Sequence, residues 1–385
     1  MLTTSEHTKF ATLFFVQNLP RGLLLSVIPI SALSILGDAQ RISTLFFVVS
    51  LGGILAALGM PMIIRTVGNY RAFLLSGAMM LLSLALLSIS DPFYFSAGLF
   101  CHIFSIASVD VSLTLYMLAR VPRSELTKFD PLRACFTVLA LTIGPFSGMW
   151  LAANISHQAP FILSACFVLL SITYFRKLKL HQVVIPKSDS LNENPYRYLL
   201  AFMKQPRLRL AYGLVCARSS WWLMFVVYTP IYIVQIGLGE LVAAAAVSLG
   251  SAWTLSVPFW GWVGRKYGVR TVLMSGFISA SMLTMLVFSF SSLPTITVVL
   301  LIFSALGTTM LDGVANVLFY RAVKRKERSE MSAVFVTYRD VGNLAAPGLF
   351  AVLLKFFALP VVFFSASVWM LVGAWHCRYI PKQMK

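Results

Sequence analysis

The chain has 385 residues, of which 58% are hydrophobic and only 11% charged, and its mean hydropathy is +0.83. Because a soluble domain carries about 25% charged residues, this composition excludes soluble enzymes, secreted modules and disordered scaffolds. A spanning helix needs roughly 20 apolar residues, so the length accommodates about twelve such helices and no nucleotide-binding domain. The sequence contains no G-x-x-x-x-G-K-[ST] phosphate loop. With no nucleophile–base pair or metal-ligand cluster visible, we expect neither an enzyme nor a bound metal or cofactor.

The net charge of +18 is distributed in a way that argues against nucleic-acid binding. The basic residues fall in alternate short gaps between apolar runs, and the remaining gaps hold only Arg41 and Lys355. The first group comprises Lys9, Arg65, Arg71, Arg120, Arg123, Lys128, Arg133, the cluster from Arg176 to Arg209, Arg265, Lys266, Arg270, the run from Arg321 to Arg328, Arg378, Lys382 and Lys385. By the positive-inside rule, this pattern predicts a multi-pass protein of the cell (inner) membrane with both termini cytoplasmic. The bilayer is the partner of these charges.

Twelve apolar segments predict an all-α membrane protein with twelve spanning helices in two halves of six. The segments are 10–36, 43–64, 72–90, 93–118, 132–153, 158–175, 210–236, 241–263, 271–291, 295–319, 331–354 and 358–377. We expect an N-terminal half at 1–176, a cytoplasmic linker at 177–209 and a C-terminal half at 210–385. Within the linker, Tyr196–Met203 is apolar enough for a short interfacial helix, with a flexible connector as the alternative.

Landmarks in the two halves recur at nearly one spacing. Gly68 and Gly268 are 200 positions apart, and so are Arg65 and Arg265. The offset is 202 both between Asp110 and Asp312 and between Pro145 and Pro347. A six-plus-six repeat with a central linker is a transporter architecture, with its site expected between the halves near the bilayer midplane.

The turn sequences resemble the signature of the major facilitator superfamily, in which glycine, Asp-Arg, glycine and basic residues connect the second and third helices. The segment from Gly261 to Arg270 matches in spacing through Arg265 and Gly268, and Arg65, Gly68 and Arg71 form a weaker copy. Arginine stands where the family has aspartate. The resemblance therefore implies a gating turn in each half, formed by these three glycines and four arginines, without the acidic latch.

The fifth segment carries Gly144, Pro145 and Gly148, which resemble the Gly-Pro motif of the superfamily's drug–proton antiporters. The same residues form a G-x-x-x-G pattern, which is typical of close helix packing. Both interpretations remain open at the level of sequence.

Four charged residues lie deep in apolar segments, where a charge costs at least roughly 2.5 kcal/mol. Arg21 is about 18 Å of helix rise beyond Lys9; Asp110 is about 15 Å from Arg120; Arg218 and Asp312 are each about 13.5 Å from the nearest basic flank. The resemblance implies that Arg21 faces Asp110 and that Arg218 faces Asp312. Three interpretations remain open. Each aspartate binds either a proton or its arginine in turn, or each pair is a fixed buried salt bridge. In the third, the two arginines bind an anion directly.

Other polar residues near these charges are candidates for substrate contact. They are Gln17, Asn18, His102 (alternatively a proton relay), Asn316 and Trp222, the last with Trp221, Tyr228 and Trp253 as an aromatic wall. We expect a monomeric secondary transporter that moves a small organic solute by rocking of its halves, with proton-coupled export first. Uptake or exchange of an organic anion, and a non-transporting sensor or assembly protein on the same fold, are the alternatives.

Overall fold

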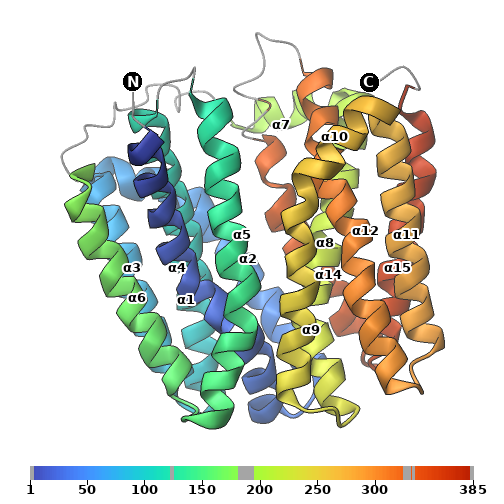
Figure 1. Ribbon diagram of the computed structural model, residues 1–385, viewed down its shortest axis with the longest axis horizontal. Helices are drawn as coiled ribbons and strands as arrows, with labels where there is room; N and C mark the ends of the chain where they lie inside the picture. Colours follow the sequence, from blue (N-terminus) through green and yellow to red (C-terminus); the bar gives the residue numbers. More distant parts are fainter. Residues whose placement is uncertain (1–3, 122–124, 181–194, 324–330, 332–333, 382–385) are drawn as a thin grey trace. The chain divides into compact units, whose positions relative to one another are not determined.

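A computed structural model describes residues 4–121, 125–180, 195–323, 331 and 334–381, which are mostly helical, with no strand among them (Figure 1). Contacts divide the chain into two compact units, Met1–Ser188 and Asp189–Lys385, and each is considered by itself. Most of the expected linker (181–194) and the basic run at 324–328 lie outside the described residues.

The N-terminal unit contains the six helices predicted from the first six apolar segments. They are α1 (Thr4–Leu36), α2 (Ala39–Val67), α3 (Asn69–Leu87), α4 (Pro92–Arg120), α5 (Leu126–Asn154) and α6 (Ala159–Lys177). Local chemistry sets several ends. For example, the Asp91 carboxylate accepts hydrogen bonds from the backbone N–H groups of Phe93 and Tyr94 and so caps α4, with Pro92 at its first position.

The C-terminal unit begins with a short helix that precedes the spanning segments. Its elements are α7 (Pro195–Lys204), α8 (Pro206–Gln235), α9 (Glu240–Ala252), η3 (Trp253–Ser256), α10 (Val257–Tyr267), α11 (Val269–Ser289), α12 (Pro294–Ala322), α14 (Tyr338–Leu353), α15 (Val361–His376) and η5 (Cys377–Tyr379). Within the described residues, eleven helical segments are long and apolar enough to cross a membrane, α9 to α10 counting as one. α14 lies in the remaining predicted segment and has 16 residues.

Two predicted helices of the C-terminal unit differ from expectation. The segment 241–263 is interrupted by the 3-10 turn η3, because Pro258 supplies no N–H and its ring clashes with the carbonyl one turn earlier. The segment 331–354 has a turn at Thr337, so that α14 begins only at Tyr338.

Matching glycine turns join helices in the two units. Gly68 ends α2 and starts α3 with φ of 84°, and Gly268 does the same between α10 and α11 with φ of 95°. A side chain is strained at such angles, whereas glycine adopts them freely. The internal repeat seen in the sequence is thus present in the backbone.

Glycines allow α1 and α5 to approach closely, and Figure 1 shows these helices side by side in the N-terminal unit. A methyl group at position 148 would overlap the carbonyl oxygen of Leu23, and one at position 144 would overlap the backbone of Gly22. The G-x-x-x-G pattern of α5 is therefore a packing surface, as one of its two interpretations predicts.

The connections of the N-terminal unit that carry basic residues gather at one end of it. The Tyr174 hydroxyl donates to the Lys9 carbonyl (3.1 Å), and Arg176 Nε donates to the Tyr70 hydroxyl (2.9 Å). A cluster of buried aromatic side chains closes this end; it includes Phe10, Phe14, Phe73, Tyr116, Phe129 and Phe175. Basic connections that are two helices apart in the chain thus lie at the same end of the unit, as expected if successive helices cross the membrane in alternate directions.

Candidate functional site

The clearest charged site lies inside the C-terminal unit, between α8 and α12. An Arg218 guanidinium nitrogen is 3.1 Å from Asp312 Oδ1, and the two side chains are 7% and 20% exposed. Trp222, one turn further along α8, donates from Nε1 to Asp312 Oδ2 at 3.0 Å. The structure therefore brings together three residues that the sequence singled out.

The surroundings of Asp312 fit an ionised carboxylate. Each of its oxygens faces a group that only donates, a guanidinium on one side and an indole N–H on the other. A protonated carboxyl has a hydrogen on one oxygen, and neither neighbour can accept it. Uptake of a proton by Asp312 therefore removes the negative charge that holds Arg218 and adds an O–H that needs an acceptor other than Arg218 and Trp222.

Tyr338, at the start of α14, is a second partner of Arg218 that the sequence did not indicate. An Arg218 guanidinium nitrogen donates to its hydroxyl at 3.0 Å, and the guanidinium carbon lies 5.3 Å from the centre of its ring. Arg218 consequently keeps a hydrogen bond and a cation–π contact when its ion pair with Asp312 is broken. Its Nε has no hydrogen-bond partner among the described residues, which leaves one donor available for a further group.

Side chains four residues apart on α8 bind the beginning of α14 and so position Tyr338. The contacts are Tyr212 Oη with Thr337 Oγ1 (2.8 Å), Cys216 Sγ with the Tyr338 carbonyl (3.6 Å) and Ser220 Oγ with the Gly342 carbonyl (3.1 Å). Residues at this spacing share one helix face. Gly342 keeps the helices close, because a methyl group there would lie 2.9 Å from the Ser219 Cβ.

The N-terminal unit places its candidate polar residues on α1 and α4. Gln17, Asn18 and His102 are buried, and neither Gln17 Oε1 nor His102 Nδ1 has a partner among the described residues. Arg21 lies one turn beyond Gln17 on α1. Asp110 is exposed, two turns further along α4. The Arg21–Asp110 contact stays a prediction.

The predicted aromatic wall divides into packed and available side chains. Trp221 is fully buried, stacks on Phe225 and donates from Nε1 to Thr284 Oγ1 (3.0 Å), and Tyr228 is equally buried. These two residues are part of the core, so they are not available to a wall that faces the substrate. Trp222 differs because it bonds Asp312. Asn316, one turn after Asp312, has a buried Oδ1 without a partner among the described atoms.

The sequence profile of the Major Facilitator Superfamily matches residues 10–255 and 249–383, which together cover nearly the whole chain. The chain belongs to the Major Facilitator Superfamily. Its fold is therefore the twelve-helix, two-half transporter fold that the sequence predicted, and the chain is a multi-pass membrane protein rather than an enzyme. No curated protein matches the chain.

Solved transporter structures share the fold at low sequence identity. The nucleoside transporter NupG has a TM-score of 0.73 at 14% identity, over 97% of this chain and 98% of that one. A POT family transporter in complex with a thioalcohol-conjugated peptide has 0.76 at 12%, over 95% and 94%. A bacterial homologue of the iron transporter ferroportin, in an inward-facing state, has 0.75 at 14%, over 98% and 99%.

The superfamily turn residues occupy the same places in both units. Arg65 lies in α2 one turn before Gly68, and Arg71 and Arg265 are exposed beside the two turns. Arg270 is held differently, because its guanidinium donates to the Ile380 carbonyl at 3.2 Å and so fastens the segment after α15 to the start of α11. A gating role for these residues stays a prediction.

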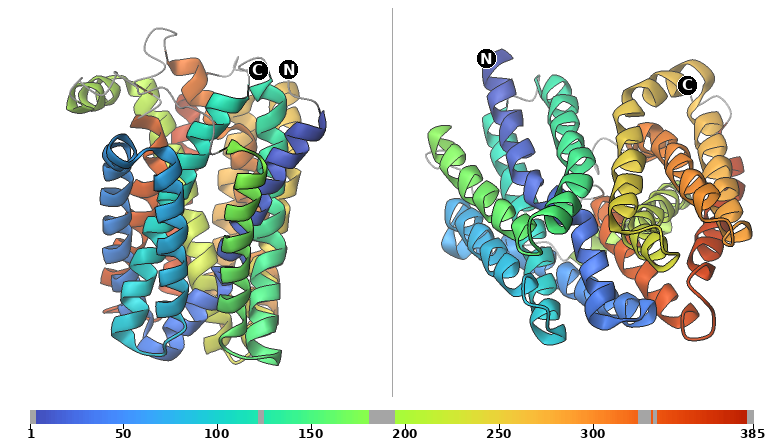
Figure 2. Two further views of the ribbon diagram at one scale, coloured as in Figure 1. Left: turned by 90° about the vertical axis from the view of Figure 1, so that its left-hand side faces the viewer. Right: turned by 60° about the horizontal axis from the view of Figure 1, so that its bottom comes forward.

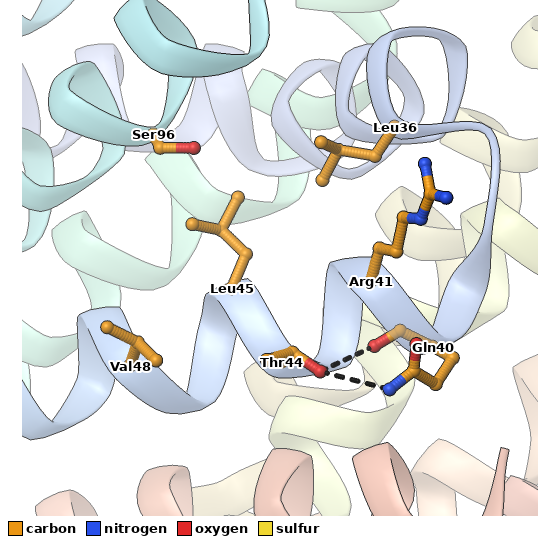
Figure 3. A pocket seen from close by; sticks show the side chains of 7 residues that line it. All are labelled: Leu36, Gln40, Arg41, Thr44, Leu45, Val48 and Ser96. Carbon is orange, nitrogen blue, oxygen red and sulfur yellow. Dashed lines mark hydrogen bonds between the residues drawn. The ribbon is translucent and has the colours of Figure 1, made fainter. Parts of the chain in front are cut away.

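A hollow at the turn between α1 and α2 is separate from the buried charges (Figure 3). Arg41, Gln40 and Leu45 line it, with Ser96 from α4. Leu36 on its rim is 15 residues beyond Arg21, about 22 Å of helix rise. The buried polar groups near Arg21 therefore lie away from the hollow, and the hollow is not the candidate substrate site.

Proposed function

We propose that the chain is a proton-coupled secondary transporter that exports a small organic solute, with Asp312 as the proton-carrying group and Arg218 as its exchangeable partner. The single observation that supports this proposal is the donor-only environment of the Asp312 carboxylate. Because protonation cancels the charge that holds Arg218 and adds an O–H that neither neighbour can accept, proton binding and side-chain rearrangement are linked. Asp110 is the corresponding proton site proposed for the N-terminal half, and Arg21, Gln17, Asn18, His102, Trp222 and Asn316 contact the solute.

The test is transport by the purified protein in liposomes with an imposed pH gradient. Panels of labelled cationic, neutral and anionic solutes identify the cargo in both orientations of the gradient. Asp312→Asn is expected to abolish gradient-driven accumulation, because the amide cannot exchange a proton, while solute exchange at equal pH continues. The matched control is Asp38→Asn, an exposed aspartate before α2 whose side chain makes no capping bond. Normal accumulation by both Asp312→Asn and Asp110→Asn would contradict the proposal.

Uptake or exchange of an organic anion is the second candidate. The observation in its favour is the free Nε of buried Arg218, since a guanidinium binds carboxylate or phosphate through two parallel hydrogen bonds. An anion would then compete with Asp312 for the same cation. Accumulation of anions alone, independent of the pH gradient, would favour this candidate, and failure to transport any solute would favour a sensor or assembly role.

A further inference from the structure

The short helix α7 runs crosswise to the long helices of its unit, as the yellow-green segment in Figure 2 (left) shows. Proline explains the sharp change of direction. Pro206 is the first residue of α8 and disfavours helical backbone in the residue before it, and Gln205 is indeed extended with φ of −92° and ψ of 108°. α7 therefore ends at Lys204, one residue before a spanning helix begins.

α7 has one face on the protein and another that the protein leaves uncovered. Phe202 is fully buried and packs edge-on against Tyr212 of α8, with ring centres 5.8 Å apart. On the other side, Leu199, Leu200 and Met203 are 44%, 64% and 47% exposed. An isolated helix of ten residues is marginal in water, so an exposed apolar face of this kind needs a further apolar environment.

Basic side chains surround this apolar face without nearby acidic ones. Lys204, Arg207 and Arg209 are all exposed, and the sequence has no aspartate or glutamate from Pro195 to Gly239. By length and composition the candidate span of α8 begins at Pro206, so we expect α7, which ends at Lys204, to lie at the depth of the headgroups. A helix with an apolar face and flanking cations binds an anionic bilayer surface by burial of the first and attraction of the second.

We infer that α7 and the first turn of α8 form a binding surface for anionic phospholipid. Leu199, Leu200 and Met203 enter the acyl boundary, and Lys204, Arg207 and Arg209 bind the phosphate groups of the same leaflet. The inference is independent of the transported solute and of proton coupling. It predicts that the lipid headgroup charge controls the stability of α7 while the spanning helices are unaffected.

Hydrogen exchange of the full chain in lipid nanodiscs tests the inference. One set of nanodiscs contains only phosphatidylcholine, and the other includes one part in three of phosphatidylglycerol. We expect amide exchange in α7 to be at least about tenfold slower with the anionic lipid, since each basic residue near such a surface adds to the attraction. Leu200→Ser is expected to weaken protection in both lipids, because it removes apolar contact without changing charge.

Two triple variants provide the matched comparison. Lys204→Gln with Arg207→Gln and Arg209→Gln is expected to remove the lipid dependence, whereas Arg71→Gln with Arg265→Gln and Lys266→Gln, which removes three exposed charges elsewhere, is expected to keep it. Equal exchange of α7 in the two lipids would overturn the inference. So would protection found only in nanodiscs that hold two copies of the chain, since the apolar face would then be a protein–protein contact.

Discussion

Arg21 and Arg218 occupy corresponding places in the first spanning helix of each unit, but the residues around them differ in chemistry. Arg218 faces a carboxylate at 3.1 Å and a tyrosine hydroxyl at 3.0 Å. Arg21 follows the buried amide side chains of Gln17 and Asn18 by one turn of α1. A carboxylate attracts an arginine until it takes up a proton. Protonation of Asp312 would therefore free Arg218 by loss of attraction.

A double-mutant cycle distinguishes the ion pair from direct anion binding. Arg218→Gln and Asp312→Asn each leave one unpaired charge, so each is expected to destabilise the protein, by up to about 3–5 kcal/mol for a fully buried pair and less here because Asp312 is partly exposed. The double variant leaves no charge and is expected to recover about 1–3 kcal/mol of the summed loss. Thermal unfolding in detergent measures the stability, and solute binding is measured on the same four proteins.

The conservative change Arg218→Lys completes this comparison. A lysine retains the positive charge but loses the planar fork that binds an anion at two points. If Arg218 serves only Asp312, Arg218→Lys keeps solute binding and the double variant regains it. If every arginine variant fails to bind and the cycle shows no coupling, the guanidinium contacts an anionic solute directly.

The sequence identified Arg218 and Asp312 because a charge in an apolar helix is costly and therefore conspicuous. Trp222 was named for another reason, as part of an aromatic wall, and not as a partner of Asp312. Tyr338 could not be identified in this way, because a tyrosine is ordinary in a membrane helix and its position depends on where α14 begins. That start is fixed by contacts from α8, which are tertiary and leave no local pattern in the sequence. Residue type alone does not show burial, so the sequence left open whether Trp221 packs in the core or faces the substrate.

At the scale of helices, the contact between α1 and α5 rests on backbone rather than on side chains. Gly22 would meet the Ala140 carbonyl if it carried a methyl group, and Gly144 and Gly148 would meet the backbone of α1. Small residues let helices pack closely in lipid, where burial of apolar surface contributes little to helix association. The approximate extents of the helices followed from the apolar runs in the sequence, whereas the break at η3 depends on how one proline is accommodated.

Gly148→Ala tests this contact. The added methyl group overlaps the Leu23 carbonyl, and backbone cannot move aside as a flexible side chain can, so we expect a loss of about 1–3 kcal/mol. Gly213→Ala is the matched control, because a methyl group there meets nothing within 4 Å in the helix α8; alanine is expected to stabilise it by about 0.5–1 kcal/mol. Thermal unfolding of both purified variants gives the comparison. If Gly148→Ala and Gly213→Ala were equally stable, the close approach of α1 and α5 would not contribute to the stability of the protein.

At the scale of the whole molecule, each unit has one basic end and one end nearly free of basic residues. Lys177 and the Gly68 turn mark the basic end of the N-terminal unit, and Arg265 and the Gly268 turn mark that of the C-terminal unit. The positive-inside rule then predicts that the basic end of each unit is cytoplasmic. The sequence carries this information in full, because it depends on charge positions alone and not on packing.

Labelling of single cysteines from outside intact cells tests this orientation in both units. In a chain with its five native cysteines replaced, cysteine substituted at Asp91 or Leu293, which lie in connections at the weakly charged ends, is expected to react with a membrane-impermeant maleimide. Cysteine at Lys177 or Arg265 is expected to react only after the membrane is permeabilised, because retaining basic residues on the cytoplasmic side fixes the insertion of the flanking helices. The two pairs are independent, since each compares opposite ends of one unit. Reaction at Lys177 or Arg265 in intact cells would show that the unit concerned has the opposite orientation, and would overturn the prediction. If only one unit were reversed, the number of spans between the Gly68 and Gly268 turns would be odd, contrary to the even number expected.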